Sequence, residues 1–190
     1  MGVFAVLFNV SAVGWLVAEV VMQVRQYRMG GRAVRTEWGS LGVVAGAVVV
    51  GQLLELLAES TLHAADYGGG SAMLTVALLV LWAGIALRLW AIRVLGQFFR
   101  GVVHIQEGHR VVTDGPYRVL RHPAYTGALV AVLGLALASG NLVGLVALFG
   151  CTLVGVLYRI RVEERVLTSA LGEAYTGYAA TTSRLLPGIW

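Results

Sequence analysis

The thirteen residues from Gly115 to Gly127, GPYRVLRHPAYTG, combine ligand-binding side chains with residues that shape the backbone. Arginine, histidine and tyrosine can bind anions, cations and aromatic rings, and they are sparse elsewhere in this apolar chain. Pro123 suits the first turn of a helix, and the apolar run 128–138 follows it directly. We therefore expect a loop at a membrane surface that leads into a spanning helix, whose first N–H groups can bind a carboxylate or a phosphate.

A second group of chemically active residues follows the last apolar run of the chain. Arg159 and Glu163 are four residues apart, so they share one face if this segment is helical. An arginine can hold a carboxylate through two hydrogen bonds, and a carboxylate can pair with an ammonium group. We expect this helix to end at about Leu171, before Gly172, and a second short helix to cover about 173–181. Without the loop described above, the same residues would be typical of a solvated amphipathic tail.

The composition indicates an integral membrane protein. Of the 190 residues, 58% are hydrophobic and 13% are charged, and the mean hydropathy is +0.79. These values exclude an ordinary soluble domain and favour a single membrane domain over residues 1–190. The single cysteine, Cys151, excludes an intramolecular disulfide and gives no zinc cluster. His63 and Asp66 lie in a glycine-rich loop that is more typical of a solvated turn than of a metal site.

The sequence predicts an all-α integral membrane fold with five transmembrane helices. The apolar runs cover approximately residues 3–22, 38–57, 72–92, 123–138 and 142–158. The fourth run is short for a hydrocarbon layer about 30 Å thick. Only Ser139, Gly140 and Asn141 join it to the fifth run, so we expect a tight antiparallel hairpin. The loop before the fourth helix and the C-terminal helical tail, segments 94–122 and 159–190, would then build one cytoplasmic site.

Arginines set the predicted orientation, because they cluster in or beside the segments that the positive-inside rule makes cytoplasmic. The N-terminus is then outside and the C-terminus is in the cytoplasm. Arg88 and Arg93 lie at the inner end of the third span, where long side chains can extend toward lipid head groups. Glu19 and Glu55 lie within the first two spans, and the sequence assigns them no role.

Two cytoplasmic segments resemble a known family. HRVVTDGPYRVLRHPAYTG, from His109 to Gly127, and RVEERVLTSALGEAYTGY, from Arg161 to Tyr178, are similar to the isoprenylcysteine carboxyl methyltransferase family. Its members are small integral membrane enzymes that use S-adenosylmethionine. The resemblance covers the chain from Leu95 onward, whereas the first two spans match the family only in being hydrophobic.

The resemblance implies a cofactor-binding set and a substrate-side arginine. The family's substrate-side arginine aligns with Arg159, so Arg159 and Glu163 are the implied catalytic residues. Eukaryotic members use a glutamine at the position of Val102, and Gln106 is nearby but out of register. The implied cofactor-binding residues are His109, Arg110, Val111, Val112, Tyr117, His122, Pro123, Ala124, Tyr125 and Glu163.

The chemistry of these residues suits methyl transfer. Glu163 can pair with the ammonium of S-adenosylmethionine, and N–H groups at the start of the fourth helix can bind its carboxylate. Tyr117 and Tyr125 can contact its sulfonium or its adenine ring. We expect a lipophilic or lipid-linked acceptor that enters from the bilayer and most simply carries a carboxylate bound by Arg159. Membrane lipids are the other expected partners, and neither a metal nor a nucleic acid is expected.

Three alternatives remain open from the sequence. A sterol-reductase-like membrane enzyme that uses NADPH also has an RHPxY element and a C-terminal segment like LLPGIW. A phospholipid N-methyltransferase would have an amine acceptor, for which Arg159 is an unsuitable anchor. A membrane protein without enzymatic activity could keep the same scaffold. Arg118 and Arg121 fit binding of lipid phosphate as well as binding of cofactor. The composition, with arginine but no lysine, favours a bacterial inner membrane protein.

Overall fold

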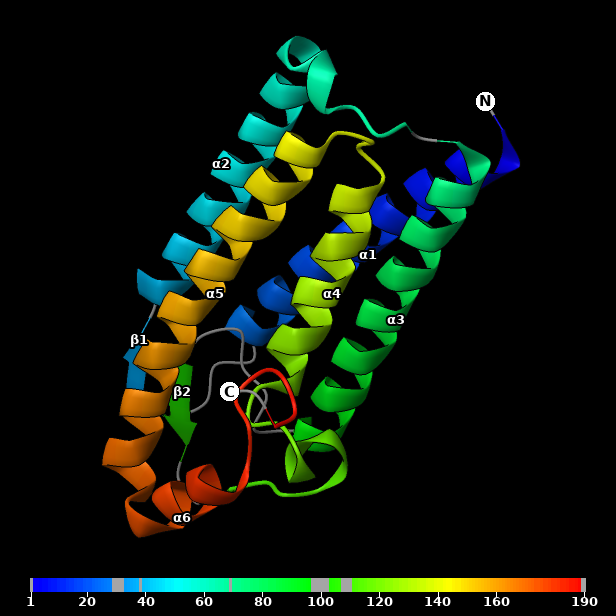
Figure 1. The fold of residues 1–190 in the computed structure, drawn as a ribbon. Coiled ribbons are helices and arrows are strands. Elements are labelled where there is room, and N and C mark those ends of the chain that lie inside the picture. Colours follow the sequence, from blue (N-terminus) through cyan, green and yellow to red (C-terminus); the bar gives the residue numbers. More distant parts are fainter. Residues whose placement is uncertain are drawn as a thin grey trace.

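The computed structural model describes residues 2–28, 33–37, 39–68, 70–96, 103–106 and 111–188. Helices dominate these ranges (Figure 1). The elements follow in the order α1 (Val3–Arg28), β1 (Ala33–Glu37), α2 (Gly39–Thr61), η1 (His63–Ala65), α3 (Ser71–Leu95), β2 (Val103–Gln106), η3 (Gly115–Arg118), α4 (Pro123–Leu137), α5 (Leu142–Leu171) and α6 (Glu173–Thr181).

The long helices form two packed pairs, in which α3 lies along α4 and α2 lies along α5 (Figure 1). α4 also contacts α5, and α1 contacts α3 from behind α4 in the view of Figure 1. α6 and the C-terminal tail cross the end of the bundle at which α4 begins and α5 ends. The two chemically active segments of the sequence therefore meet at one end of the bundle.

The backbones of α3 and α4 are in direct contact because glycines of each helix face the other helix. A Cβ atom on Gly84 would lie 2.2 Å from the nitrogen of Ala131, and one on Gly127 would lie 2.5 Å from the nitrogen of Arg88. Carbon atoms at optimal contact are about 3.5–4.0 Å apart, so neither position has room for a side chain. This close contact fixes the start of α4 against α3.

The α2–α5 pair also packs on small residues and encloses a carboxyl group. A Cβ atom on Gly155 would lie 2.8 Å from the Cβ atom of Ala47. Glu55 is buried, accepts a hydrogen bond from Gln52 Nε2 at 2.5 Å, and has Gly144 against its side chain. Glu55 therefore lies in the interface between α2 and α5.

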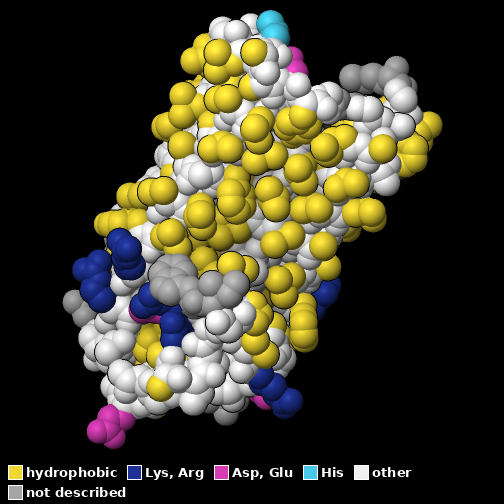
Figure 2. All heavy atoms as spheres, viewed as in Figure 1, with side chains coloured by type: hydrophobic (Ala, Val, Ile, Leu, Met, Phe, Trp, Pro, Cys, Tyr) yellow, Lys and Arg dark blue, Asp and Glu magenta, His cyan; other side chains and the backbone are white. Residues whose placement is uncertain are grey.

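These helices confirm the predicted all-α membrane fold. By length and composition, α1, α2, α3 and α5 can each cross a membrane, and α4 is a shorter apolar helix of 15 residues. Hydrophobic side chains cover much of the flank of the bundle in Figure 2, as expected for a surface that faces lipid. The predicted end of α5 at Leu171 and the short helix at 173–181 are also observed, with Gly172 between them at φ 54°.

Two features of the connections were not predicted. β1 and β2 pair antiparallel, with Ala33 opposite Gln106, and so join the segment before α2 to the segment after α3. At the other end of the bundle, Asn141 is fully buried and donates from Nδ2 to Asp66 Oδ1 at 2.7 Å and to the carbonyl oxygen of Leu62 at 3.0 Å. Asn141 thus ties the α2–α3 connection to the start of α5. Among the described residues no group of three metal-ligating side chains occurs.

Candidate functional site

The loop before α4 is shaped by a glycine and a proline. Gly115 has a positive φ of 55°, and Pro116 follows it at the start of η3. This turn directs the ring of Tyr117 inward, where it packs in a cluster with Ala91 of α3 and Ala124 of α4. Burial raises the pKa of the Tyr117 hydroxyl, so this group remains protonated at neutral pH.

The C-terminal tail is hydrogen-bonded to this loop through the backbone. The Arg121 N–H donates to the Ser183 carbonyl at 2.7 Å, and the His122 N–H donates to the Arg184 carbonyl at 3.1 Å. In the opposite direction, the Ser183 N–H donates to the Val119 carbonyl at 3.0 Å. The segment just before α4 and the end of the chain are therefore one structural unit.

Helix α6 is attached to the same loop by a tyrosine. Tyr178 donates its hydroxyl proton to the carbonyl oxygens of Tyr117 at 2.8 Å and of Leu120 at 3.2 Å. Burial raises the pKa of Tyr178 to about 12, which keeps this proton in place at neutral pH. The predicted helical tail thus covers the loop instead of lying free on the membrane surface.

Tyr125, in the first turn of α4, connects the two predicted catalytic residues. Arg159 Nε donates to the Tyr125 hydroxyl at 2.6 Å, and this hydroxyl donates to Glu163 Oε2 at 2.6 Å. The Arg159 guanidinium also lies 5.8 Å from the centre of the Tyr125 ring, a cation–π distance. The i, i+4 spacing correctly placed Arg159 and Glu163 on one face of α5, and Tyr125 of α4 joins them.

Arg159 is buried, with 3% of its surface exposed, so its position is set by its partners. Its Nη1 donates to Ser40 Oγ at 3.1 Å, and Ser40 is fully buried at the start of α2. The site therefore includes a residue from the N-terminal half of the chain, which sequence reasoning missed. Serine is too common near helix starts for its type alone to signal this role.

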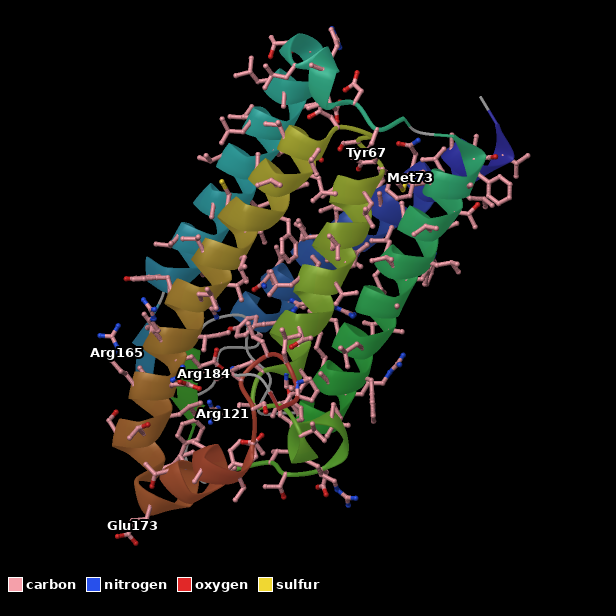
Figure 3. All side chains as sticks on the ribbon, viewed as in Figure 1. Tyr67, Met73, Arg121, Arg165, Glu173 and Arg184 are labelled. Atoms are coloured by element: carbon pink, nitrogen blue, oxygen red, sulfur yellow. The ribbon has the colours of Figure 1, made fainter. Side chains whose placement is uncertain are left out.

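Sequence reasoning also missed Glu164, the second glutamate of the EE pair. Its Oε1 lies 3.3 Å from His122 Nε2 and 3.0 Å from Arg121 Nε, and its Oε2 accepts from Arg184 Nε at 2.9 Å. Figure 3 shows Arg121 and Arg184 close together beside α5. Consecutive residues of a helix point about 100° apart, so Glu163 faces Tyr125 while Glu164 faces the tail. The EE doublet was the available signal.

The two arginines of the loop differ in their surroundings. Arg121 Nη1 donates to the carbonyl oxygens of Ala179 and Thr182, the latter at 3.1 Å. Arg121 is thus engaged in attaching α6 and the tail, which disfavours the lipid-phosphate role considered for it. Arg118 is exposed at the end of η3 and remains available for lipid phosphate.

The remaining predicted cofactor residues surround the same region. His122, Pro123 and Ala124 are buried at the start of α4, and the rings of His122 and Tyr125 stack at 5.7 Å between centres. Val112 packs beside the Tyr117 cluster, and Val111 is its partly buried neighbour. His109 and Arg110 lie outside the described residues, as does Val102.

The site contains carboxylates that could bind the cationic part of a ligand and tyrosines that could contact its aromatic part. Tyr175 of α6 is buried, and its hydroxyl has no hydrogen-bond partner among the described residues. Burial, followed by the charges of Glu164 and Glu163, raises the pKa of Tyr175, so its hydroxyl stays protonated at neutral pH. A buried hydroxyl without a partner suits a ligand that supplies the missing hydrogen bond.

The chain resembles known membrane methyltransferases in sequence. Residues 72–174 match the model of a family described as phospholipid methyltransferase. A probable protein-S-isoprenylcysteine O-methyltransferase of Oryza sativa subsp. indica is 33% identical over 119 residues, covering 60% of this chain and 61% of that protein. Phosphatidylethanolamine N-methyltransferase B of Dictyostelium discoideum is 37% identical over 82 residues, covering 40% of this chain and 38% of that protein. The chain thus spans less than two thirds of either relative.

The fold has a solved counterpart. The structure of a eukaryotic intramembrane Ras methyltransferase, isoprenylcysteine carboxyl methyltransferase, superimposes with a TM-score of 0.57 at 24% sequence identity. The superposition covers 76% of this chain and 52% of that protein. The predicted resemblance is thus confirmed in both sequence and fold, and it holds for more of the chain than the family model matches.

Proposed function

Because this chain belongs to the phospholipid methyltransferase family, we propose that it transfers a methyl group from S-adenosylmethionine to a lipophilic acceptor. The observation that carries the proposal is the chain of hydrogen bonds from Arg159 through Tyr125 to Glu163. The Arg159 guanidinium, which can bind an acceptor, lies on one side of the Tyr125 hydroxyl. The Glu163 carboxylate, which can bind a cofactor, lies on the other side. The site also lies at the end of the bundle at which α4 begins (Figure 1), and the flank of this bundle is apolar (Figure 2), which suits an acceptor that approaches from the bilayer.

In this proposal, the cofactor lies between the loop before α4 and helices α5 and α6. Glu163 pairs with its ammonium group, and the positive end of the α4 helix dipole attracts its carboxylate. The rings of Tyr117 and Tyr125, both packed at the α4 start, offer faces to a sulfonium or to adenine. His109, Arg110, Val111 and Val112 would complete the cofactor set. When bound, S-adenosylmethionine supplies a methyl group attached to a positively charged sulfur.

The protein's part in the reaction is to position the acceptor and exclude water. Displacement at an activated methyl group needs an in-line approach, so orientation contributes more than proton transfer when the acceptor is a carboxylate. Arg159 can orient a carboxylate, because its planar guanidinium is held by Tyr125 and Ser40. We therefore propose a carboxylate on a lipid-like molecule as the acceptor, as in the protein-S-isoprenylcysteine O-methyltransferases that the chain resembles.

A second acceptor has specific support. The family description and the Dictyostelium discoideum relative both refer to phospholipids, whose methylation takes place on an amine. An amine acceptor would have to lose a proton before attack, and a buried arginine would repel its ammonium form. For this reason the carboxylate is the primary proposal, and phosphatidylethanolamine is the second acceptor to test.

We further propose a single domain in a bacterial inner membrane, with the N-terminus outside and the C-terminus in the cytoplasm. Figure 2 shows arginine side chains around the end of the bundle that carries α6, which the positive-inside rule makes cytoplasmic. A Glu173→Cys variant, combined with Cys151→Ser, tests the orientation in intact cells. A membrane-impermeant thiol reagent should label it only after the inner membrane is opened, and labelling of intact cells would reverse the orientation.

The central test of function is calorimetric titration of the purified protein with S-adenosylhomocysteine, the product form of the cofactor. We expect saturable binding by the wild type. Glu163→Gln should weaken it about 10- to 100-fold, because a hydrogen bond to a charged group contributes about 1.5–3 kcal/mol. The control is Glu173→Gln, since Glu173 is exposed at the start of α6 and points away from the bundle in Figure 3.

Competing ligands separate the alternatives. Binding of NADPH without binding of S-adenosylhomocysteine would move the protein to the reductase class. Binding of neither would contradict the enzymatic proposal and favour a scaffold without catalysis. If S-adenosylhomocysteine binds, transfer of a labelled methyl group to a farnesylated cysteine carboxylate or to phosphatidylethanolamine in vesicles identifies the class of acceptor.

A further inference from the structure

Helix α1 lies outside the segment 72–174 that matches the family model, yet it carries a charged residue into the bundle. The exposed large side chains of α1 are mainly valine and leucine, as expected for a helix that faces lipid. One face turns toward α3, where Phe8 is buried and Ala12 and Trp15 pack against the same cluster. Glu19 continues this face one turn beyond Trp15, so its carboxylate points inward.

Glu19 meets the buried arginine of α3. Arg88 Nη2 donates to Glu19 Oε2 at 2.7 Å, and Arg88 Nε donates to Glu19 Oε1, which makes a two-bond ion pair. Trp15 Nε1 also donates to Glu19 Oε1 at 3.2 Å. Only 9% of the Arg88 side chain is exposed, so the expectation that Arg88 extends toward lipid head groups is wrong. The reason is that a carboxylate within the bundle gives the guanidinium a better partner.

A third bond links this pair to the candidate cofactor site. Arg88 Nη1 donates to the carbonyl oxygen of Ala124 at 3.0 Å, in a buried position. Ala124 lies in the first turn of α4, between His122 and Tyr125, the two side chains whose rings stack beside the site. Of the three Arg88 nitrogens, two are thus bonded to Glu19 and the third is directed at the α4 turn.

Electrostatics requires the two residues to act together. A charged side chain within a membrane bundle is costly, and removing one partner of a buried pair is strongly destabilising because the other charge is left uncompensated. A planar guanidinium held by two bonds to one carboxylate has a fixed direction for its remaining N–H groups. Glu19 therefore determines where Arg88 places its third donor.

We propose that Glu19 and Arg88 form a positioning pair for the cofactor-binding turn His122–Tyr125, so that α1 is a functional part of the site. Glu19 orients Arg88, and Arg88 holds the first turn of α4 through the Ala124 carbonyl. This assignment rests on the proposed function for the identity of the ligand, S-adenosylmethionine. The position of the α4 turn itself can be measured without any ligand.

The decisive comparison uses Arg88→Met, Glu19→Gln and the exchanged pair Glu19→Arg with Arg88→Glu. The exchanged pair restores opposite charges in the bundle but leaves no donor for the Ala124 carbonyl. We expect it to recover the thermal stability lost in Arg88→Met, while its Kd for S-adenosylhomocysteine stays about tenfold or more above that of wild type. Glu19→Gln should raise the Kd less than Arg88→Met, since glutamine still bonds the guanidinium. Arg93→Met is the control, because Arg93 is exposed on the same helix.

Hydrogen exchange of the unliganded protein gives a second readout that does not depend on the proposed function. Amides 124–128 should exchange faster in Arg88→Met and in the exchanged pair than in wild type or Arg93→Met. Wild-type exchange in both variants would overturn the proposal. So would recovery of ligand affinity together with stability in the exchanged pair, since the pair would then be only structural. If the wild type binds no S-adenosylhomocysteine, the proposed function fails, and the exchange data still decide whether the pair positions the turn.

Discussion

The free energy of unfolding is expected to be more than about 3 kcal/mol lower in the Gly84→Ala variant than in wild type. This loss occurs although alanine usually stabilises a helix by about 0.5–1 kcal/mol relative to glycine. The new Cβ atom would lie 2.2 Å from the nitrogen of Ala131 and 2.6 Å from the carbonyl oxygen of Gly127. Both of these atoms belong to the backbone of α4, so a rotamer change cannot relieve the overlap. α3 and α4 would have to move apart, and the packing along both helices would be lost.

Thermal unfolding of the protein in lipid nanodiscs measures this effect, with an expected fall in Tm of about 10 °C. The matched control is Gly150→Ala on α5, where an added Cβ would meet nothing within 4 Å. Gly150→Ala should raise the Tm slightly through helix propensity, so the two variants have opposite expected signs. Equal changes in the Tm of the two variants would contradict the direct contact between the α3 and α4 backbones.

The contact also explains why the same substitution should weaken cofactor binding. Arg88 follows Gly84 by one turn of α3, and Gly127 follows Tyr125 by two residues in α4. Separating the helices at Gly84 would therefore pull the Arg88 guanidinium away from the Ala124 carbonyl. In this fold the helix packing and the geometry of the site cannot be changed independently.

The sequence predicted the helices well because their limits have strong local signals. Long apolar runs define four spanning helices, Pro123 marks the start of α4, and Gly172 with its positive φ separates α5 from α6. The strand pair β1–β2 lacked such a signal, since four or five residues are too few for a clear alternating pattern.

The partners of each helix were harder to predict. The three-residue link Ser139–Asn141 correctly made α4 and α5 neighbours, yet α4 packs mainly along α3 and α5 mainly along α2. The spanning parts of these helices are apolar on nearly all sides, so hydrophobic periodicity does not show which face is inside. Glycines at the contacts, such as Gly84 and Gly155, were visible in the sequence, but their partners depend on the tertiary arrangement.

In the candidate site, the sequence indicated residues that are close along the chain but not the contacts between helices. Helical spacing placed Arg159 and Glu163 together, and the GPYxxxRHPxYxG loop marked the start of α4 as the second component. The Tyr125 hydroxyl that joins them could not be predicted, because α4 and α5 meet there only in the folded protein. Glu19 gave a usable signal, since a charged residue within a span usually faces a partner, but no sequence rule paired it with Arg88.

The largest expected loss of activity belongs to Arg159→Lys, which preserves the charge and removes the planar fork. Arg159 bonds Tyr125 through Nε and Ser40 through Nη1, two separate nitrogens that diverge from one carbon. A lysine has a single nitrogen, so it cannot keep both partners and also bind an acceptor carboxylate through two parallel bonds. Misplacement of a reacting group by about 1 Å can reduce a rate about 100-fold, and we expect a loss of at least this size.

The measurement is transfer of a labelled methyl group to a farnesylated cysteine carboxylate, together with titration of S-adenosylhomocysteine. Glu163 is unchanged in Arg159→Lys, so the Kd for S-adenosylhomocysteine should stay within about threefold of wild type while methyl transfer collapses. Arg165→Lys is the control, because Arg165 is exposed on the same helix and points outward in Figure 3. A parallel loss of cofactor affinity would instead place Arg159 on the cofactor side of Tyr125. Full activity of Arg159→Lys toward phosphatidylethanolamine would reject the carboxylate acceptor, because that outcome requires no bidentate anchor.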